Sequence, residues 1–172
     1  MLRFYFPDNR FPKAPLNHTR LIARAIVLDE EGKVILNLVH RDDMFGNQTC
    51  YETPGGGIDE GETPEEAVVR ECEEEIGAKV EILAPLCIVE DAYSLIARKN
   101  VGYYFLVQIK KRTRIHHESE GDDFIVKNVA FSLDEAISAL KNQPDDGFSG
   151  LVKQRELPVL LLAKRRIEKG NR

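Results

Sequence analysis

The 172-residue chain has few cysteines, no long hydrophobic run and no excess of basic residues, and each shortage excludes a class of protein. Its three cysteines, Cys50, Cys72 and Cys87, are an odd number without close pairs, which argues against a disulfide framework and a zinc knuckle. No apolar segment is long enough to cross a membrane or resembles a signal peptide, so we expect a cytoplasmic setting without a membrane partner. The net charge of −5 argues against a nucleic-acid partner, because nucleic-acid binders usually carry a basic excess.

The composition that is present is typical of a globular protein, with 42% hydrophobic and 31% charged residues. The length lies within the range of one domain and suffices to bury a sizeable core. We therefore expect a single domain over residues 1–172. Residues 1–19 contain three prolines and four aromatic residues and are expected to form either an irregular arm or a short edge strand. This arm could pack on the domain or on a partner subunit, so a homodimer is one expectation.

The rest of the chain is organised around residues 51–78, where a run of three glycines precedes an acidic helix. Consecutive glycines let main-chain groups approach a ligand closely. After them, Thr63 and Glu66 have the spacing of a capping box, with proline at the first helical position between them. Gly77 supplies a stop, since a left-handed residue commonly follows a helix end. We predict a helix over residues 64–76.

Three glutamates of this helix point to a metal site. Glu71, Glu74 and Glu75 fall within one arc of about 100°, beside an apolar stripe. Carboxylates gathered in this way repel one another and raise each other's pKa values, and a divalent cation removes that penalty. Mg²⁺ prefers oxygen ligands, so we predict Mg²⁺ or Mn²⁺ on these glutamates, with Glu62 as a fourth carboxylate and the carbonyl of Gly56 as a neutral ligand.

Residues around this site are expected to contact the substrate. Gly55, Gly57 and Glu62 belong to the loop itself. Arg41 lies in a polar segment that runs through residues 40–47, and we predict a phosphate contact for it, although a solvated loop is the simpler alternative.

Hydrophobic patterning predicts strands on both sides of the acidic helix and two helices after them. The expected strands cover residues 21–28, 34–39, 79–83, 86–89, 101–109 and 129–131. A second capping box at Ser132 opens a helix that ends before Pro144. A final helix is expected from Leu157 to Glu168, with Pro158 in its first turn. This order of elements fits one layered α/β domain with a mixed sheet between helices.

The glycine loop and acidic helix resemble the Nudix hydrolase family. That family's box is a Gly, five residues, a Glu, seven residues and then Arg-Glu-apolar-any-Glu-Glu-any-Gly-apolar. Every position is filled here, by Gly56, Glu62, Arg70, Glu71, Cys72, Glu74, Glu75, Gly77 and Ala78. The resemblance covers about residues 20–140. It implies the α/β (α+β) class and a Nudix-like α/β/α sandwich in which helices flank a central mixed β-sheet.

The resemblance also implies a reaction and a partner. A divalent ion, Mg²⁺ or Mn²⁺, would assist cleavage of the diphosphate in a nucleoside diphosphate linked to another moiety. The partner would be a small nucleotide-type molecule: a nucleotide, a nucleotide sugar, ADP-ribose or a dinucleoside polyphosphate. Arg70 is expected to contribute to catalysis by orienting the glutamates. The general base would be Glu74 or a loop glutamate, for which Glu120 is the candidate and Glu118 the reserve.

Two alternatives stay open. A Nudix-like module that binds nucleotides without cleaving them is expected to lose metal glutamates, and all of them are present here. An RNA 5′-end pyrophosphohydrolase would share the chemistry but needs a basic or aromatic track for RNA, which the acidic balance of the chain does not favour. A Walker loop is excluded, because Lys-Ser/Thr does not follow the glycines.

Overall fold

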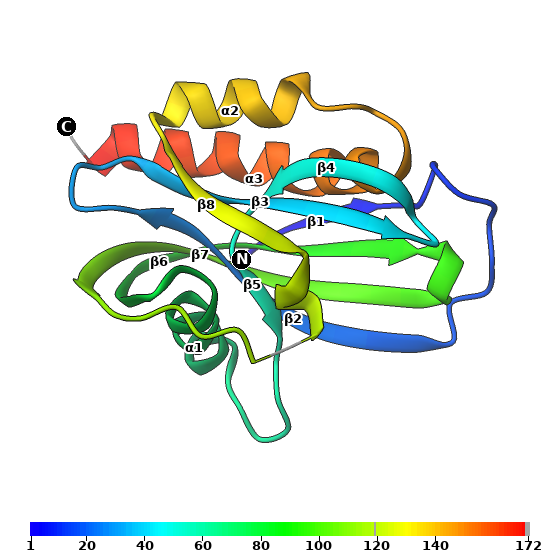
Figure 1. Ribbon diagram of the computed structural model, residues 1–172, viewed down its shortest axis with the longest axis horizontal. Coiled ribbons are helices and arrows are strands. Elements are labelled where there is room, and N and C mark those ends of the chain that lie inside the picture. The colour runs from blue at the N-terminus through cyan, green and yellow to red at the C-terminus, as the bar shows by residue number, and fades with distance from the viewer. Residues whose placement is uncertain (119, 171–172) are drawn as a thin grey trace.

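A mixed sheet of eight strands forms the centre of the molecule, with helices on both of its faces. The computed structural model describes residues 1–118 and 120–170, without the side chain of Glu120. Figure 1 shows α2 (Leu133–Asn142) and α3 (Gly147–Gly170) over one face of the sheet and α1 (Pro64–Ile76) over the other. The predicted sandwich is therefore confirmed. Within the described residues, no helix combines the length and apolar content needed to cross a membrane.

The sheet follows the order β1-β6-β7-β2-β3-β4, while β5 pairs with β2 and β8 pairs with β3. The strands are β1 (Leu2–Phe6), β2 (His18–Leu28), β3 (Val34–Asp43), β4 (Gly46–Glu52), β5 (Gly55–Gly57), β6 (Ala78–Tyr93), β7 (Arg98–Arg112) and β8 (Ile125–Phe131). Two 3₁₀ helices, η1 (Ser94–Ile96) and η2 (Glu120–Phe124), follow β6 and precede β8. The sheet is mixed because β2 and β7 are parallel, whereas β6 and β7 are antiparallel.

The central strand β2 contributes to both hydrophobic cores. Ile26 packs in the core under α2 and α3, and Ala25 and Val27 pack in the core under α1. Successive side chains of a strand point to opposite faces, so a strand buried on both faces has a continuous apolar sequence. This explains why residues 21–28 show a largely hydrophobic run.

The acidic helix forms where the sequence predicts it. Thr63 accepts a hydrogen bond from the backbone N–H of Glu66, whose side chain accepts one from the backbone of Thr63 in return. Gly77 adopts a left-handed conformation with φ of 59° and ends the helix. The buried stripe of α1 includes Val68 and Cys72, which anchor the helix on the sheet. Local capping and an apolar stripe therefore position the glutamates on the remaining face.

The last helix differs from the prediction. α3 begins at Gly147, so Pro158 lies in its interior instead of its first turn. Phe148, Leu151 and Val152 are buried in a cluster against β3, β4 and β6. This packing stabilises the additional turns, although proline lacks the backbone donor that a helix interior uses.

Two further segments are more regular than predicted. The polar loop expected over residues 40–47 is a hairpin of β3 and β4, with Asp43 in register with Gly46. The strand pieces expected on either side of Pro85 are one strand, β6, whose pairing with β7 shifts near that residue. Such bulges absorb a proline without ending the strand. Residues 2–6 form the edge strand β1, which pairs with β6.

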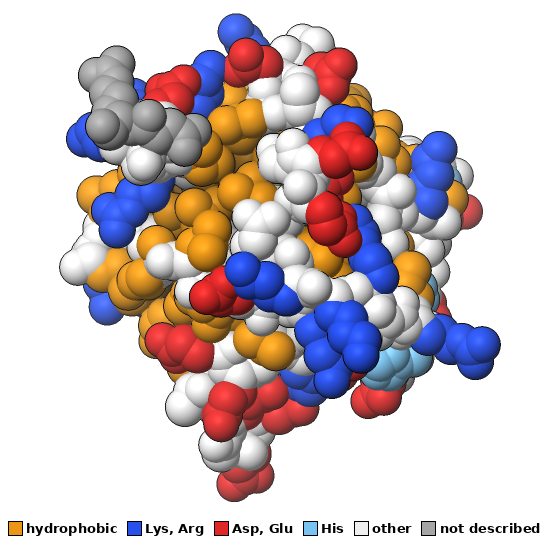
Figure 2. Space-filling model, turned by 90° about the vertical axis from the view of Figure 1, so that its left-hand side faces the viewer, with side chains coloured by type: hydrophobic (Ala, Val, Ile, Leu, Met, Phe, Trp, Pro, Cys, Tyr) orange, Lys and Arg blue, Asp and Glu red, His pale blue; other side chains and the backbone are white. Residues whose placement is uncertain are grey.

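A homodimer stays a prediction. Figure 2 shows hydrophobic side chains gathered on the end of the molecule that carries the end of α3, with charged side chains around them. Surfaces of this composition are often covered by partners.

Candidate active site

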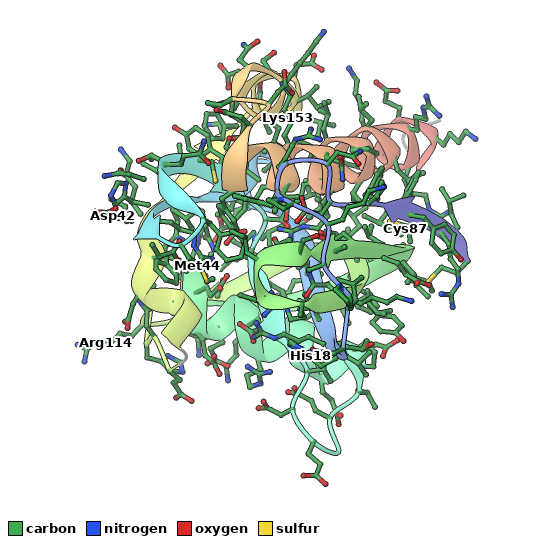
Figure 3. The ribbon with its side chains drawn as sticks, turned by 90° about the vertical axis from the view of Figure 1, so that its right-hand side faces the viewer. His18, Asp42, Met44, Cys87, Arg114 and Lys153 are labelled. Atoms are coloured by element: carbon green, nitrogen blue, oxygen red, sulfur yellow. The ribbon has the colours of Figure 1, made fainter. Side chains whose placement is uncertain are left out.

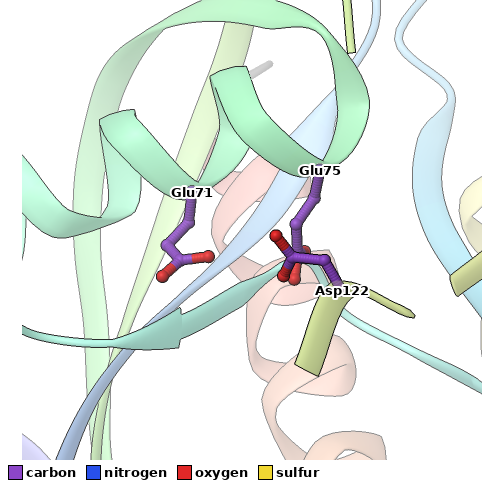
Figure 4. Close-up of side chains that lie close together, drawn as sticks. All are labelled: Glu71, Glu75 and Asp122. Carbon is purple, nitrogen blue, oxygen red and sulfur yellow. The ribbon is translucent and has the colours of Figure 1, made fainter. Parts of the chain in front are cut away.

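A group of three buried carboxylates lies where α1 meets η2, and we call it the acidic group: Glu71, Glu75 and Asp122. Each offers one oxygen, and these oxygens all lie within 4.8 Å of one another. Figure 4 shows Glu71 and Glu75, one helical turn apart on α1, pointing toward Asp122 of the neighbouring segment. Sequence reasoning predicted the two glutamates and missed Asp122.

Hydrogen bonds from two directions hold Glu75 in place. Its Oε2 accepts from Nδ2 of Asn37 at 2.8 Å and from the backbone N–H of Gly55 at 2.9 Å. Asn37 is oriented in turn, because Nδ2 of Asn128 donates to its Oδ1 at 2.8 Å. Burial, followed by the charge of Glu71, raises the pKa of Glu75 well above its ordinary range. Glu75 is therefore fixed in position while its charge is destabilised.

Glu71 has one oxygen with a partner and one without. Its Oε1 accepts from Nη1 of Arg70 at 2.9 Å. Its Oε2 is buried and has no hydrogen-bond donor among the described residues. Burial is the largest cause that raises the pKa of Glu71 to about 7. The predicted repulsion between carboxylates adds to this rise in pKa, but loss of solvent has the greater effect.

The glycine loop approaches Glu71 so closely that a side chain could not fit there. A Cβ atom at Gly56 would lie 2.6 Å from Oε1 of Glu71. This contact brings the backbone of β5 against the acidic group, as the prediction of a Gly56 carbonyl ligand requires. The ligand role of Gly56 stays a prediction.

Arg70 has the geometry expected of an orienting residue. Its Nε and Nη2 each donate to Glu62 at 2.8 Å, and Nη2 also donates to the carbonyl of Gly57 at 2.9 Å. With its bond to Glu71, this guanidinium joins the glycine loop to the acidic helix. The hydrogen bonds from Arg70 lower the pKa of Glu62. Glu62 therefore contacts Arg70 in this structure, and its predicted metal or substrate contact stays a prediction.

Glu74 neighbours the acidic group, because Nη1 of Arg70 contacts both Glu71 and Glu74, and its predicted metal contact stays a prediction. It is buried, and both of its oxygens lie 3.4 Å from Nη1 of Arg70. It lines a second surface depression, together with His116, and does not line the cavity beside Glu75. Glu120, the other predicted general base, has a side chain outside the described residues. The exposed reserve candidate, Glu118, donates its backbone N–H to Asp122 at 3.0 Å.

A cavity of about 560 Å³ opens beside the acidic group. Glu75, Asp122, Gly55 and Gly56 form part of its wall. The rest combines basic and aromatic side chains, which include Arg20, Arg24, Arg41, Arg98, Arg155, Phe45, Tyr93, Phe124 and Phe148. Of these residues, sequence reasoning singled out Arg41 alone as a site residue.

Arg41 is already engaged within the cavity wall. Its Nε donates to Asp43 at 2.9 Å. The guanidinium carbon lies 4.3 Å from the ring centre of Phe124, 4.6 Å from that of Phe148 and 4.9 Å from that of Phe45. Arg41 thus holds three aromatic rings together, and its predicted phosphate contact stays a prediction.

The acidic group fits a hard divalent cation. All its donors are carboxylate oxygens, the ligands that such cations prefer. An ionised carboxylate is costly to bury without a partner, and a cation would satisfy the orphaned Oε2 of Glu71. Glu71, Glu75 and Asp122 are therefore the residues that would hold it.

Comparison with solved structures agrees with the fold. The NUDIX hydrolase from Nitrosomonas europaea superposes with a TM-score of 0.62 at 16% identity, covering 90% of this chain and 91% of that one. At this identity the likeness concerns the fold alone. The sandwich with a carboxylate group beside its glycine loop defines a class of hydrolases that act on pyrophosphate bonds. Residues 18–151 match the NUDIX domain family, and the chain belongs to it as a Nudix hydrolase.

Curated relatives carry two different activities. The RNA pyrophosphohydrolase of a Nitratiruptor species is 40% identical over 111 residues, which are 58% of this chain and 70% of that protein. The 8-oxo-dGTP diphosphatase of Escherichia coli (strain K12) is 43% identical over 56 residues, which are 33% of this chain and 42% of that protein.

Proposed function

We propose that this chain hydrolyses the pyrophosphate linkage at the 5′ end of RNA, with Mg²⁺ or Mn²⁺ as the cofactor. The similarity to an RNA pyrophosphohydrolase over 111 residues supports this substrate. The sequence argument ranked RNA below small nucleotides because the chain is acidic overall. The cavity weakens that objection, because Arg20 and Arg98 line it and have no carboxylate partner among the described residues.

The observation that carries the proposal is the cavity's mixed lining. Five arginines and four aromatic rings share one wall with two carboxylates of the acidic group. The 5′ end of an RNA presents several linked phosphates followed by unstacked bases. Arginine recognises phosphate through its fork of donors, and aromatic rings stack on bases. Arg20 and Arg98 would contact the phosphates and the partly exposed Phe124 a base, whereas the other three rings are buried in a core cluster.

The residues of the site have separate roles. A divalent cation held by Glu71, Glu75 and Asp122 would neutralise phosphate charge and lower the pKa of a bound water. Arg70 keeps Glu71 and the glycine loop in register, and Asn37 fixes the carboxylate of Glu75. These contacts remove the need to reorganise the site when substrate arrives.

The hydrolytic step needs a proton acceptor. The oxygen of water bonds to phosphorus, the bond from phosphorus to the bridging oxygen breaks, and a carboxylate takes the proton from water. Glu74 is engaged with Arg70, whereas Glu120 is two residues from Asp122 in η2, so we propose Glu120 as the acceptor. Exchange of Glu120 for glutamine should then lower kcat more than exchange of Glu74.

A second candidate substrate is a free nucleoside triphosphate. The similarity to an 8-oxo-dGTP diphosphatase supports it over a shorter stretch of 56 residues. A cavity of about 560 Å³ also has the size of a small-molecule site. The non-catalytic alternative is less well supported, because the glutamates of the box are all present.

A product-resolved assay separates these candidates. Short RNA with a 5′-triphosphate is incubated with the protein and Mg²⁺ or Mn²⁺, beside deoxynucleoside triphosphates, ADP-ribose, nucleotide sugars and dinucleoside polyphosphates. We expect RNA with a 5′-monophosphate as product. Glu75→Gln should lower the rate by at least about 10²-fold, the upper end of what loss of an outer partner costs.

The matched control is Glu65→Gln, which changes an exposed glutamate of the same helix and should leave the rate unchanged. Turnover of free nucleotides without turnover of RNA would replace the proposal by the second candidate. A folded wild-type protein that cleaves nothing in the panel would favour the non-catalytic module.

A further inference from the structure

The five arginines of the cavity fall into two groups, and the first group is neutralised by neighbouring carboxylates. Arg24 lies 3.5 Å from both Glu52 and Glu156 and donates to a backbone carbonyl at 2.6 Å. Arg155 donates to Glu156 at 2.8 Å. Arg41 is paired with Asp43, as described above. These three side chains therefore have structural partners and need no ligand to balance their charge.

The second group, which we call the arginine pair, consists of Arg20 and Arg98. No described carboxylate lies within ion-pairing distance of either guanidinium, although every other arginine of the cavity has one. The Nε of Arg98 is buried and has no acceptor among the described residues. Burial, and next the charge of Arg20, lowers the pKa of Arg98. The Nε atoms of Arg24 and Arg155 also lack an acceptor, so what distinguishes Arg98 is its lack of a carboxylate partner. A buried charge without such a partner indicates an anion that binds from outside.

Strand pairing directs the arginine pair into the same cavity. On the parallel strands β2 and β7, Arg20 is in register with Asn100, and Arg98 is in register with His18. Side chains two residues apart on a strand share a face, so both guanidinium groups lie on one face of the sheet. In Figure 3, which labels His18, the register partner of Arg98, this residue lies in the lower part of the view.

The arginine pair is also close to the glycine loop. A Cβ atom at Gly57 would lie 2.9 Å from Nη2 of Arg20, so this glycine leaves room for the guanidinium. Arg20 and Arg98 line the cavity together with Gly55, Gly56 and Glu75. An anion on the pair would thus share the cavity with a phosphate held near the acidic group.

We propose that Arg20 and Arg98 form a phosphate subsite that takes the terminal phosphate of a 5′-triphosphate end. The assignment of that phosphate to RNA rests on the proposed function, whereas the affinity for a chain of linked phosphates does not. Two guanidinium forks offer enough donors for the three free oxygens of a terminal phosphate. A 5′-diphosphate end has one phosphate fewer and would leave the subsite empty.

A binding experiment tests the subsite without catalysis. Inorganic triphosphate is titrated into the protein by calorimetry, in EDTA and again with Mg²⁺. The double variant Arg20→Gln/Arg98→Gln should weaken binding by on the order of 10²-fold, since each lost charged hydrogen bond contributes about tenfold. Arg165→Gln, which changes an exposed arginine of α3, is the matched control and should bind like the wild type. Equal binding by the double variant, or no binding by the wild type, overturns the subsite.

The melting temperatures of the variants, measured in the absence of triphosphate, show whether they fold. Removing two unpaired cations relieves repulsion, so the double variant should melt no lower than the wild type. If it does melt lower, Arg98→Lys keeps the charge and loses the fork, and it should still weaken triphosphate binding by about tenfold. Unchanged binding by that folded variant would also overturn the subsite.

Kinetics with RNA then identify the phosphate. For 5′-triphosphate RNA, the double variant should raise KM by at least about tenfold, whereas for 5′-diphosphate RNA the rise should stay below about threefold. Equal changes of KM for both RNAs would overturn the assignment to the terminal phosphate.

If RNA is not cleaved but triphosphate binding is lost in the double variant, the subsite stands and the RNA function fails. If RNA is cleaved with unchanged binding and KM, the function stands and the subsite fails.

Discussion

The acidic group and the arginine pair border one cavity and carry opposite charges. Their charges are neutralised in different ways. A carboxylate of the acidic group can take up a proton, and the raised pKa of Glu71, about 7, makes this easy near neutral pH. It can also accept a divalent cation. An arginine keeps its proton at any physiological pH, so only an anion can balance Arg20 and Arg98.

This difference indicates what kind of ligand completes the site. Buried carboxylates favour a cation, and unpaired guanidinium groups favour an anion, so a metal-bound chain of phosphates satisfies both at once. The neutralised arginines, Arg24 and Arg155, provide an internal reference, because they have the same chemistry but a structural role.

The largest effect on stability should come from the neutralised arginines. Arg155→Met leaves the fully buried Glu156 without its closest cation, and breaking a buried ion pair in this way costs about 3–5 kcal/mol of unfolding free energy. Arg98→Met removes a cation that has no carboxylate partner among the described residues but lies 5.2 Å from the ring centre of Tyr93, so its cost should be about 1 kcal/mol. Urea denaturation of both variants measures the difference. Similar midpoints for the two would show that the arginines do not divide into these groups.

The metal-free protein should lose stability as the pH rises from about 5 to about 7. The pKa of Glu71 in the folded chain is about 7, against an ordinary value of 4.5. The folded state therefore holds this proton more tightly than the unfolded state does. The contribution is complete below the unfolded value and is lost as pH rises through the folded one. Glu71 alone accounts for about 3 kcal/mol across this window.

Thermal unfolding in EDTA at pH 5.5 and pH 7.5 tests this linkage. Glu71→Gln should flatten the pH dependence, and Glu65→Gln should leave it unchanged. Mg²⁺ should raise the melting temperature of the wild type more at the higher pH, where the carboxylates are ionised. A wild type that is equally stable at both pH values in EDTA would argue against buried, strained carboxylates.

A smaller effect is expected from the residue that orients Glu75. Asn37→Ala removes one of the two donors to Oε2 of Glu75 and should raise the Mg²⁺ concentration for half-maximal activity by about 10–100-fold. The control is Asn47→Ala, which changes an exposed asparagine of β4. A fall in kcat at unchanged Mg²⁺ dependence would instead assign Asn37 to the chemical step.

The parts of the site that sequence reasoning predicted are those built by one continuous segment. The glycine loop, the cap at Thr63 and the two glutamates Glu71 and Glu75 depend on contacts within residues 55–77, so spacing alone indicates their arrangement. The sandwich also follows from local patterns, because strands and amphipathic helices each show their own period.

No local sequence pattern indicates the role of Asp122. It is one of several acidic residues before β8, and pairing of β8 with β3 brings this segment to α1. The cavity arginines come from β2, β3, β7 and α3, so net charge could not reveal their concentration. One signal was available: Arg20 and Arg24 share a single face of β2 with Ile22 between them, and charged residues repeated on one face of a largely apolar strand suggest a site.

The smallest expected effect concerns Arg41, the one arginine of the cavity predicted from sequence. Its guanidinium is paired with Asp43 and stacked on three rings, so Arg41→Lys keeps the charge and loses the planar contacts. We expect a loss of about 1 kcal/mol of unfolding free energy, the scale of a partly buried cation–π contact. KM for 5′-triphosphate RNA should change by less than about threefold, which is within about 0.7 kcal/mol. A KM effect as large as that of the arginine pair would place Arg41 among the phosphate contacts, and the two kinds of arginine would then overlap.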